Sequence, residues 1–151
     1  MFHQNGSNLA KLVIIAAVVM TALIIVSGVA TASSNCKKVE GKLTLNPDTT
    51  GSYKGDIKGN SVFSQTNFAF TDIPDVALLT GNNLIHTDDG DLMTQDAIVL
   101  RATGAGDFAE VDTVVGGTGR WAGATGVIQA TGKFTFETGG KGNYSGQICT
   151  P

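Results

Sequence analysis

The chain has 151 residues and a formal net charge of −3 at pH 7, from 10 Lys and Arg residues against 13 Asp and Glu residues. This length accommodates one domain and a leader, which we place at residues 33–151 and 1–32. Because the basic residues form no cluster that could contact phosphates, no nucleic-acid binding is expected.

The N-terminus has the parts of a secretory leader. Lys11 precedes an uncharged, largely apolar segment, residues 12–32, which ends in the sequence Ala-Thr-Ala. Small residues of this kind precede a signal peptidase site, so we expect cleavage between Ala32 and Ser33 and a domain that is secreted, periplasmic or at the cell surface. The alternative is an uncleaved anchor, because about 20 apolar residues suffice to span a bilayer. The protein would then contact the membrane only through residues 12–32, with the domain outside.

Two cysteines, Cys36 and Cys149, lie at the two ends of the predicted domain, and the chain has no others. Outside the cytoplasm such a pair is expected to form a disulfide. The bridge requires the two ends to lie within about 7 Å of each other, Cα to Cα. A redox-active or metal-binding pair is the alternative, but there is no C-x-x-C spacing, and neither His3 nor His86 has a histidine or cysteine beside it. No metal site and no cofactor are therefore predicted.

Alternation of apolar and polar residues dominates the chain after residue 33, and no window there has the 3.6-residue period of an amphipathic helix. Turn residues such as Asn46-Pro47-Asp48 separate the alternating segments. The pattern predicts about seven to nine short antiparallel strands. The alternating segments are residues 38–45, 52–58, 62–70, 76–79 (a strand or one helical turn), 84–86, 91–102, 108–115, 127–131, 133–137 and 144–148, with 139–142 as a turn.

About eight such strands can close into a small barrel whose interior is filled by side chains or holds one small ligand. Closure removes exposed strand edges and brings the first and last strands together. We therefore predict an all-β fold, an antiparallel barrel of about eight strands preceded by an N-terminal hydrophobic helix. An open β-sandwich is the alternative. The candidate ligand-binding residues of the barrel cavity are Tyr53, Phe134, Phe136, Tyr144 and Trp121. Trp121 is expected to plug the barrel or cover its rim.

The most distinctive stretch is VVGGTGRWAGATG, residues 114–126. It resembles the glycine-rich turn of the allene oxide cyclase and dirigent barrel superfamily, and of exported bacterial proteins similar to it. The likeness covers residues 85–132, where Asp96 and residues 108–115 match the central strands, and the rest only through the strand pattern. It implies an eight-stranded barrel and, as in many plant members, a homo-trimer. The superfamily's catalytic carboxylates and arginines have no matched positions here, so its activity is not carried over.

The densest polar cluster consists of His86, Asp88, Asp89 and Asp91. Several oxygens converging on one point could bind calcium. The same residues fit a solvated hairpin turn, since Asp-Gly suits a type I′ reversal, and the turn is the favoured interpretation.

A second candidate set is Arg101, Glu110 and Asp112, on adjacent predicted strands. Carboxyl groups buried beside an arginine could act as general acid and base. They could equally form an exterior ion pair. The alternation favours the exterior for Glu110 and Asp112, with Val111 and Val115 inside.

Three functions are compatible with these features. The first is an exported barrel that binds a small apolar ligand or a surface partner; the second is a cyclase-like or dirigent-like enzyme that uses the barrel cavity. The third is a structural envelope protein with a filled core. The first two require an internal cavity, typically of about 300 Å³ or more, and a buried carboxyl group with a strongly shifted pKa would favour the enzyme. The sequence favours binding or a structural role over catalysis.

Overall fold

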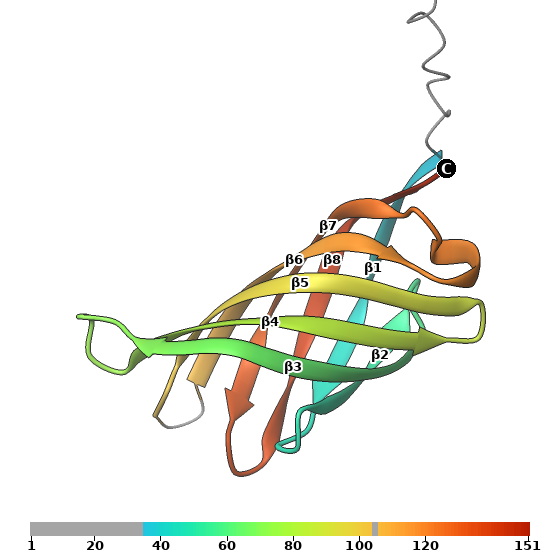
Figure 1. Cartoon of the computed structure of the whole chain (residues 1–151). Helices are drawn as coiled ribbons and strands as arrows, with labels where there is room; N and C mark the ends of the chain where they lie inside the picture. Colours follow the sequence, from blue (N-terminus) through green and yellow to red (C-terminus); the bar gives the residue numbers. More distant parts are fainter. Residues whose placement is uncertain (1–34, 104–105) are drawn as a thin grey trace, which may run out of the picture. The chain divides into compact units, whose positions relative to one another are not determined.

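The computed structural model describes residues 35–103 and 106–151 (Figure 1). The predicted leader with its helix, the cleavage point between Ala32 and Ser33, and the domain boundary lie outside these residues. No helix in the described part has the length and hydrophobicity needed to span a bilayer. In chain order the elements are β1 (Asn35–Leu45), β2 (Thr50–Gly55), β3 (Gly59–Phe70), β4 (Val76–Thr87), β5 (Gly90–Arg101), β6 (Gly106–Gly117), the 3₁₀ helix η1 (Gly119–Trp121), β7 (Thr125–Thr135) and β8 (Gly139–Thr150).

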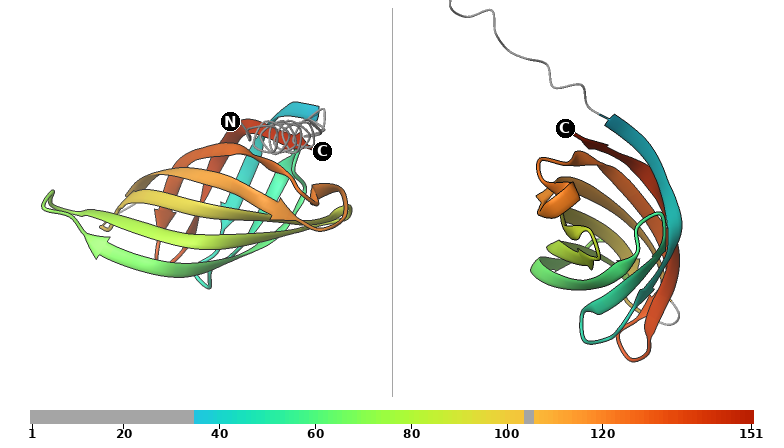
Figure 2. Two further views of the ribbon diagram at one scale, coloured as in Figure 1. Left: turned by 45° about the horizontal axis from the view of Figure 1, so that its top comes forward. Right: turned by 90° about the vertical axis from the view of Figure 1, so that its right-hand side faces the viewer.

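The eight strands form one closed antiparallel barrel. Each strand pairs with the next along the chain, and β1 pairs with β8 to close the sheet. This closing seam runs the length of β1, from the pair Asn35 and Thr150 to the pair Leu45 and Gly140. Figure 2 shows the first strand in blue beside the last in red. The all-β barrel expected from the sequence is confirmed, and the open sandwich is excluded.

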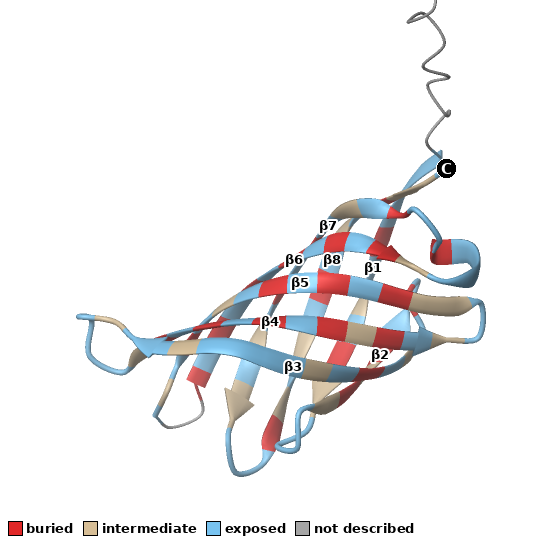
Figure 3. Cartoon of the chain, in the orientation of Figure 1, coloured by how far each residue is buried: buried red, intermediate tan, exposed pale blue. Residues whose placement is uncertain are grey.

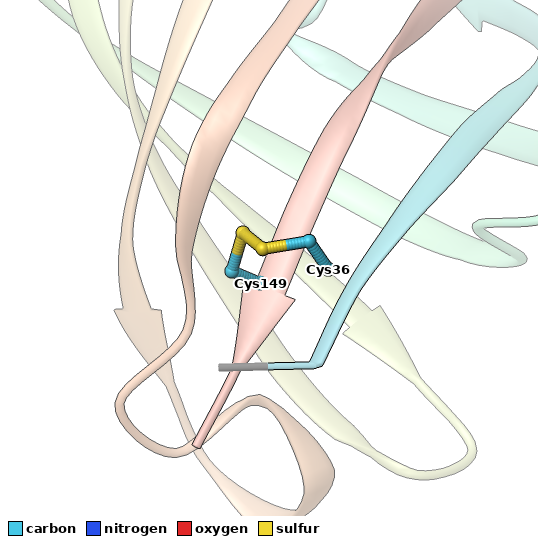
Figure 4. The surroundings of a disulfide bond; sticks show 2 residues. All are labelled: Cys36 and Cys149. Atoms are coloured by element: carbon cyan, nitrogen blue, oxygen red, sulfur yellow. A yellow bond between two sulfur atoms is a disulfide. The ribbon is translucent and has the colours of Figure 1, made fainter. Parts of the chain in front are cut away.

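A disulfide fastens this seam. Cys36 and Cys149 are direct partners in the β1–β8 register, with their Cα atoms 3.9 Å apart, and they form the bridge predicted from the sequence (Figure 4). The bond joins residues 113 positions apart. Closing so long a loop removes conformational freedom from the unfolded chain, which stabilises the barrel.

Several strands are longer than the alternation predicts. The segments 76–79 and 84–86 belong to one strand, β4, because the residues between them pair with β5 without interruption. The predicted turn 139–142 is the start of β8, and the true turn comes just before it. Gly140 explains the error: a Cβ there would lie 2.0 Å from the backbone oxygen of Lys133 on β7. Glycine at this position permits close strand packing rather than chain reversal.

Side chains alternate between the barrel interior and the solvent, and Figure 3 shows this alternation along β4, β5 and β6. At the end of the barrel that carries the β4–β5 turn, Trp121 of η1 is buried and donates a hydrogen bond from Nε1 to Thr87 Oγ1 at 3.0 Å. That end is therefore closed by apolar packing. The buried apolar residues are Val39, Leu43, Tyr53, Ile57, Ala77, Leu79, Ile85, Leu92, Leu100, Phe108, Val114, Trp121, Ala124, Ile128, Ala130, Tyr144 and Ile148.

Tyr144 fixes the β2–β3 turn at the same end. Its hydroxyl accepts a hydrogen bond from Ile57 N at 2.8 Å and donates one to Ile57 O at 3.0 Å. Gly41 leaves room for this side chain, since a Cβ at that position would lie 2.6 Å from the Tyr144 hydroxyl oxygen. The pairing of inward glycines with tyrosines therefore lets large side chains fill the barrel.

Candidate functional site

Three carboxyl groups lie inside the barrel on two neighbouring strands. Asp96 belongs to β5, and Glu110 and Asp112 belong to β6. All three residues are buried, at most 7% exposed, and one carboxylate oxygen of each lies within 4.8 Å of the others. Asp96 and Asp112 are direct register partners, an arrangement in which like charges destabilise a sheet. These three residues, called here the inner acidic cluster, are the group in the described part of the chain that could hold a cation.

Neighbouring polar side chains satisfy only some of the hydrogen-bond acceptors of this cluster. Thr94 Oγ1 donates a hydrogen bond to Asp96 Oδ1 at 2.5 Å, and the carboxyl groups of Glu110 and Asp112 share another. Three buried side-chain atoms have no hydrogen-bond partner among the described residues, namely Asp96 Oδ2, Asp112 Oδ1 and Asn83 Oδ1. All three are oxygens, and burying an unpaired acceptor is costly.

Burial dominates the electrostatics of the cluster. It raises the pKa of Asp96 to about 6, against a smaller lowering by the Thr94 hydrogen bond. Burial and then the charge of Asp96 raise the pKa of Glu110 to about 7. For Asp112, burial, the charges of Glu110 and Asp96 and the hydrogen bond to Glu110 together raise the pKa to about 10. At neutral pH, Asp112 is therefore protonated, Glu110 is partly ionised and Asp96 is mostly ionised.

No positive side chain compensates these charges. Every lysine and arginine in residues 35–103 and 106–151 is exposed, including Arg101 on β5. The pKa of Tyr53 is also raised well above its usual value. Burial is the largest cause, and the charges of Asp112, Glu110 and Asp96 follow. The interior thus has an uncompensated negative charge, which is rare for buried acids that serve only a structural role.

A cavity of about 120 Å³ extends from Glu110, one residue of the cluster, toward the end of the barrel opposite Trp121. Glu110 and Asn83 form part of its polar lining, and the β1–β2 turn, residues 46–50, borders it. Its wall is mainly apolar and aromatic. The apolar lining residues are Leu45, Pro47, Tyr53, Phe63, Leu79, Ile98, Leu100, Phe108, Phe134 and Phe136.

The structure separates the five aromatic residues expected in the interior into two groups. Tyr53, Phe134 and Phe136 line the cavity, and Phe136 is 51% exposed at its edge. Tyr144 is buried with its ring centroid 5.3 Å from that of Tyr53, but it is not part of the cavity wall and instead holds the β2–β3 turn. Trp121 fills the opposite end of the barrel. Three of the five aromatic residues therefore line the cavity, and the other two pack the opposite end.

The predicted orientation of β6 is wrong. Glu110 and Asp112 point inward, whereas Val111 and Val115 are 45% and 51% exposed. The error has a physical cause, because both faces of β6 carry apolar residues and the alternation cannot tell which one is buried. Arg101 does not join the two carboxyl groups and is exposed.

Asp96, Thr94 and Asn83 were not identified as site residues from the sequence. A signal for Asp96 exists in the alternation of β5, where it shares a face with the buried Leu92 and Leu100. Asn83 gives no such signal, because it stands in a polar Gly-Asn-Asn run that resembles a turn. Register across β4, β5 and β6 brings these residues together, and register is not encoded in any one strand.

The cluster of His86 and three aspartates forms the β4–β5 turn and its surroundings. His86 Nδ1 lies 2.8 Å from Asp91 Oδ1, and Arg120 donates to Asp89 Oδ2 at 2.9 Å. The Arg120 guanidinium also lies 4.2 Å from the ring centroid of Trp121. These contacts tie the turn to η1, and the aspartates of this turn do not appear among the groups of described residues that could hold a metal ion.

Comparisons with known proteins found no matching family model, no matching curated protein and no matching solved structure. Membership of the allene oxide cyclase and dirigent superfamily therefore stays a prediction from residues 114–126.

Proposed function

We propose that this chain is an exported barrel that binds a small molecule with an apolar body inside the open end of the barrel. The observation that carries the proposal is the cavity of about 120 Å³, whose aromatic wall leads to buried polar groups. The cavity is smaller than the roughly 300 Å³ typical of ligand pockets, so the ligand must be small. An apolar cavity of about 150 Å³ can hold benzene, and the space therefore suits a ligand no larger than about one aromatic ring.

The disulfide supports the proposed compartment. A bond between Cys36 and Cys149 persists in oxidising surroundings, which is consistent with a location outside the cytoplasm. Export by the leader over residues 12–32 is part of the proposal.

A titration with benzyl alcohol, followed by amide chemical shifts, tests ligand binding. We expect shifts confined to residues that line the cavity. Ile98→Phe, which fills the cavity, should weaken binding about 10-fold or more, because it occupies the space that the ring needs. Val99→Phe is the matched control, since Val99 is the next residue on the same strand and points outward. Equal binding by both variants, or no binding by the unmodified protein, would refute the proposal.

A second candidate function is an enzyme that moves protons within the same cavity. The specific observation is that Glu110, which lines the cavity, has its carboxyl group within 4.8 Å of that of Asp112, and that burial raises the pKa of the two groups to about 7 and about 10. Such a pair places a base beside an acid at neutral pH. Native mass spectrometry of protein from its own host identifies any retained molecule. Conversion of that molecule by the protein, but not by Asp112→Asn, would establish the enzyme, and its recovery unchanged would rule this candidate out.

A further inference from the structure

The base of the cavity presents acceptors without donors. Asn83 is 6% exposed and lines the cavity; its Nδ2 donates to the Tyr53 hydroxyl at 3.3 Å, and its Oδ1 has no partner among the described residues. The inner acidic cluster contributes Glu110 to the cavity lining, and its Asp96 Oδ2 and Asp112 Oδ1 also have no partner among the described residues. These oxygens come from β4, β5 and β6, and they require a group that donates several hydrogen bonds and accepts none.

The charge of the base favours a cation. The protonation states at neutral pH give the inner acidic cluster about one to two negative charges. No described lysine or arginine lies inside to balance them. Tyr53, Phe108 and Phe134 surround the approach to the cluster. Aromatic faces attract cations, so the wall and the base favour the same sign of charge.

The wall of the cavity is mainly apolar and suits a ligand with an apolar body. Leu79, Leu100 and Phe108 are buried residues of this wall, and none of them offers a side-chain polar atom. A bare metal ion would gain nothing from such a wall, and calcium prefers about six to eight oxygen ligands. The combination fits an organic cation better than a metal ion.

We infer that the barrel binds a small primary amine, with its ammonium group at Glu110 and Asn83, where the cavity meets the inner acidic cluster, and its apolar body along the aromatic wall. An ammonium group has N–H donors, one positive charge and no acceptor, which suits a lining with an unpaired oxygen and a negative charge. The inference rests on the proposed function, because it names the ligand class for the same cavity.

The test compares benzylamine with benzyl alcohol, which has nearly the same size and shape but no charge. Both are titrated into the purified full-length protein at pH 7 and followed by amide chemical shifts. We expect benzylamine to bind about 10-fold more tightly or better, because charge-assisted hydrogen bonds are stronger than neutral ones. The preference should fall in Asp96→Asn and Glu110→Gln, while benzyl alcohol still binds to show that both variants are folded. Asp107→Asn is the control, since Asp107 lies on β6 but points outward.

Three results would overturn the inference. Equal binding of the two compounds would mean that the carboxyl groups do not select a cation, although the proposed binding function would stand. Binding of calcium or magnesium ions in the same cavity, without binding of benzylamine, would identify the cluster as a metal site. Binding of neither compound would remove both the inference and the proposed function.

Discussion

The substitution Asp112→Asn is predicted to stabilise the barrel at neutral and alkaline pH. The carboxyl group of Asp112 has a raised pKa of about 10 in the folded barrel, compared with 3.8 for an ordinary aspartate. Between these two values the folded state holds a proton that the unfolded state has released. The contribution of Asp112 to the free energy of unfolding is therefore fully present below pH 3.8. It is lost as the pH rises toward 10, by about 1.4 kcal/mol per pH unit. By pH 7 the loss from this one group is about 4 kcal/mol.

The most selective window is pH 8 to 9, where folded Asp96 and Glu110 are ionised, folded Asp112 still holds its proton, and the tyrosines are protonated in both the folded and the unfolded state. The unmodified protein should lose about 1.4 kcal/mol of unfolding free energy per pH unit there. Asn carries no titrating proton, so the Asp112→Asn variant should show a slope close to zero, and its amide can still donate to Glu110. The assay is urea unfolding followed by the fluorescence of Trp121, the only tryptophan.

The exposed Asp107 on the same strand provides the control, because Lys133 donates to its carboxylate at 2.9 Å and lowers its pKa. Asp107→Asn should keep the slope of the unmodified protein. A stability that does not change between pH 8 and 9 in the unmodified protein, or an unchanged slope in Asp112→Asn, would show that Asp112 is not a buried neutral acid.

Three other features of the barrel give predictions for the same unfolding assay. Replacing both Cys36 and Cys149 by Ser should cost about 4–5 kcal/mol by loop entropy, compared under oxidising conditions; a loss below about 1 kcal/mol would mean that the seam does not depend on the bridge. Tyr144→Phe should cost about 2–4 kcal/mol, since both polar backbone atoms of Ile57 lose their buried partner, and an unaffected midpoint would contradict this role. Gly41→Ala should destabilise by about 1–3 kcal/mol or prevent folding, because its Cβ would lie 2.1 Å from a backbone oxygen of β2; a neutral effect would show that β1 and β2 can move apart.

The sequence was sufficient for the fold class because the signals that fix it are local or depend on two residues. Alternation identifies strands one at a time, and the pair Cys36 and Cys149 supplies the long-range constraint that the ends meet. The errors fall where glycines serve packing rather than turning, as at Gly140, and where polar residues continue a strand, as in the middle of β4.

The site was harder to predict, since it depends on which face of β6 is buried. Apolar residues on both faces, such as Val111 outside and Val114 inside, remove the contrast on which the alternation argument depends. Asp96 and Asp112 are 16 residues apart in the chain and meet only through the β5–β6 register. An acid placed inside a barrel also violates the expectation that charges are exposed, and such violations tend to mark functional positions.

The proposed site depends on three carboxyl groups that are buried inside the barrel, one of which lines the cavity. The most direct measurement is a pH titration of the Asp and Glu side-chain carboxyl carbons by ¹³C NMR, with Asp96→Asn, Glu110→Gln and Asp112→Asn used to assign the resonances. We expect raised midpoints for these three groups, at about 6, 7 and 10. Midpoints for all three within about one pH unit of ordinary carboxyl values would contradict this expectation.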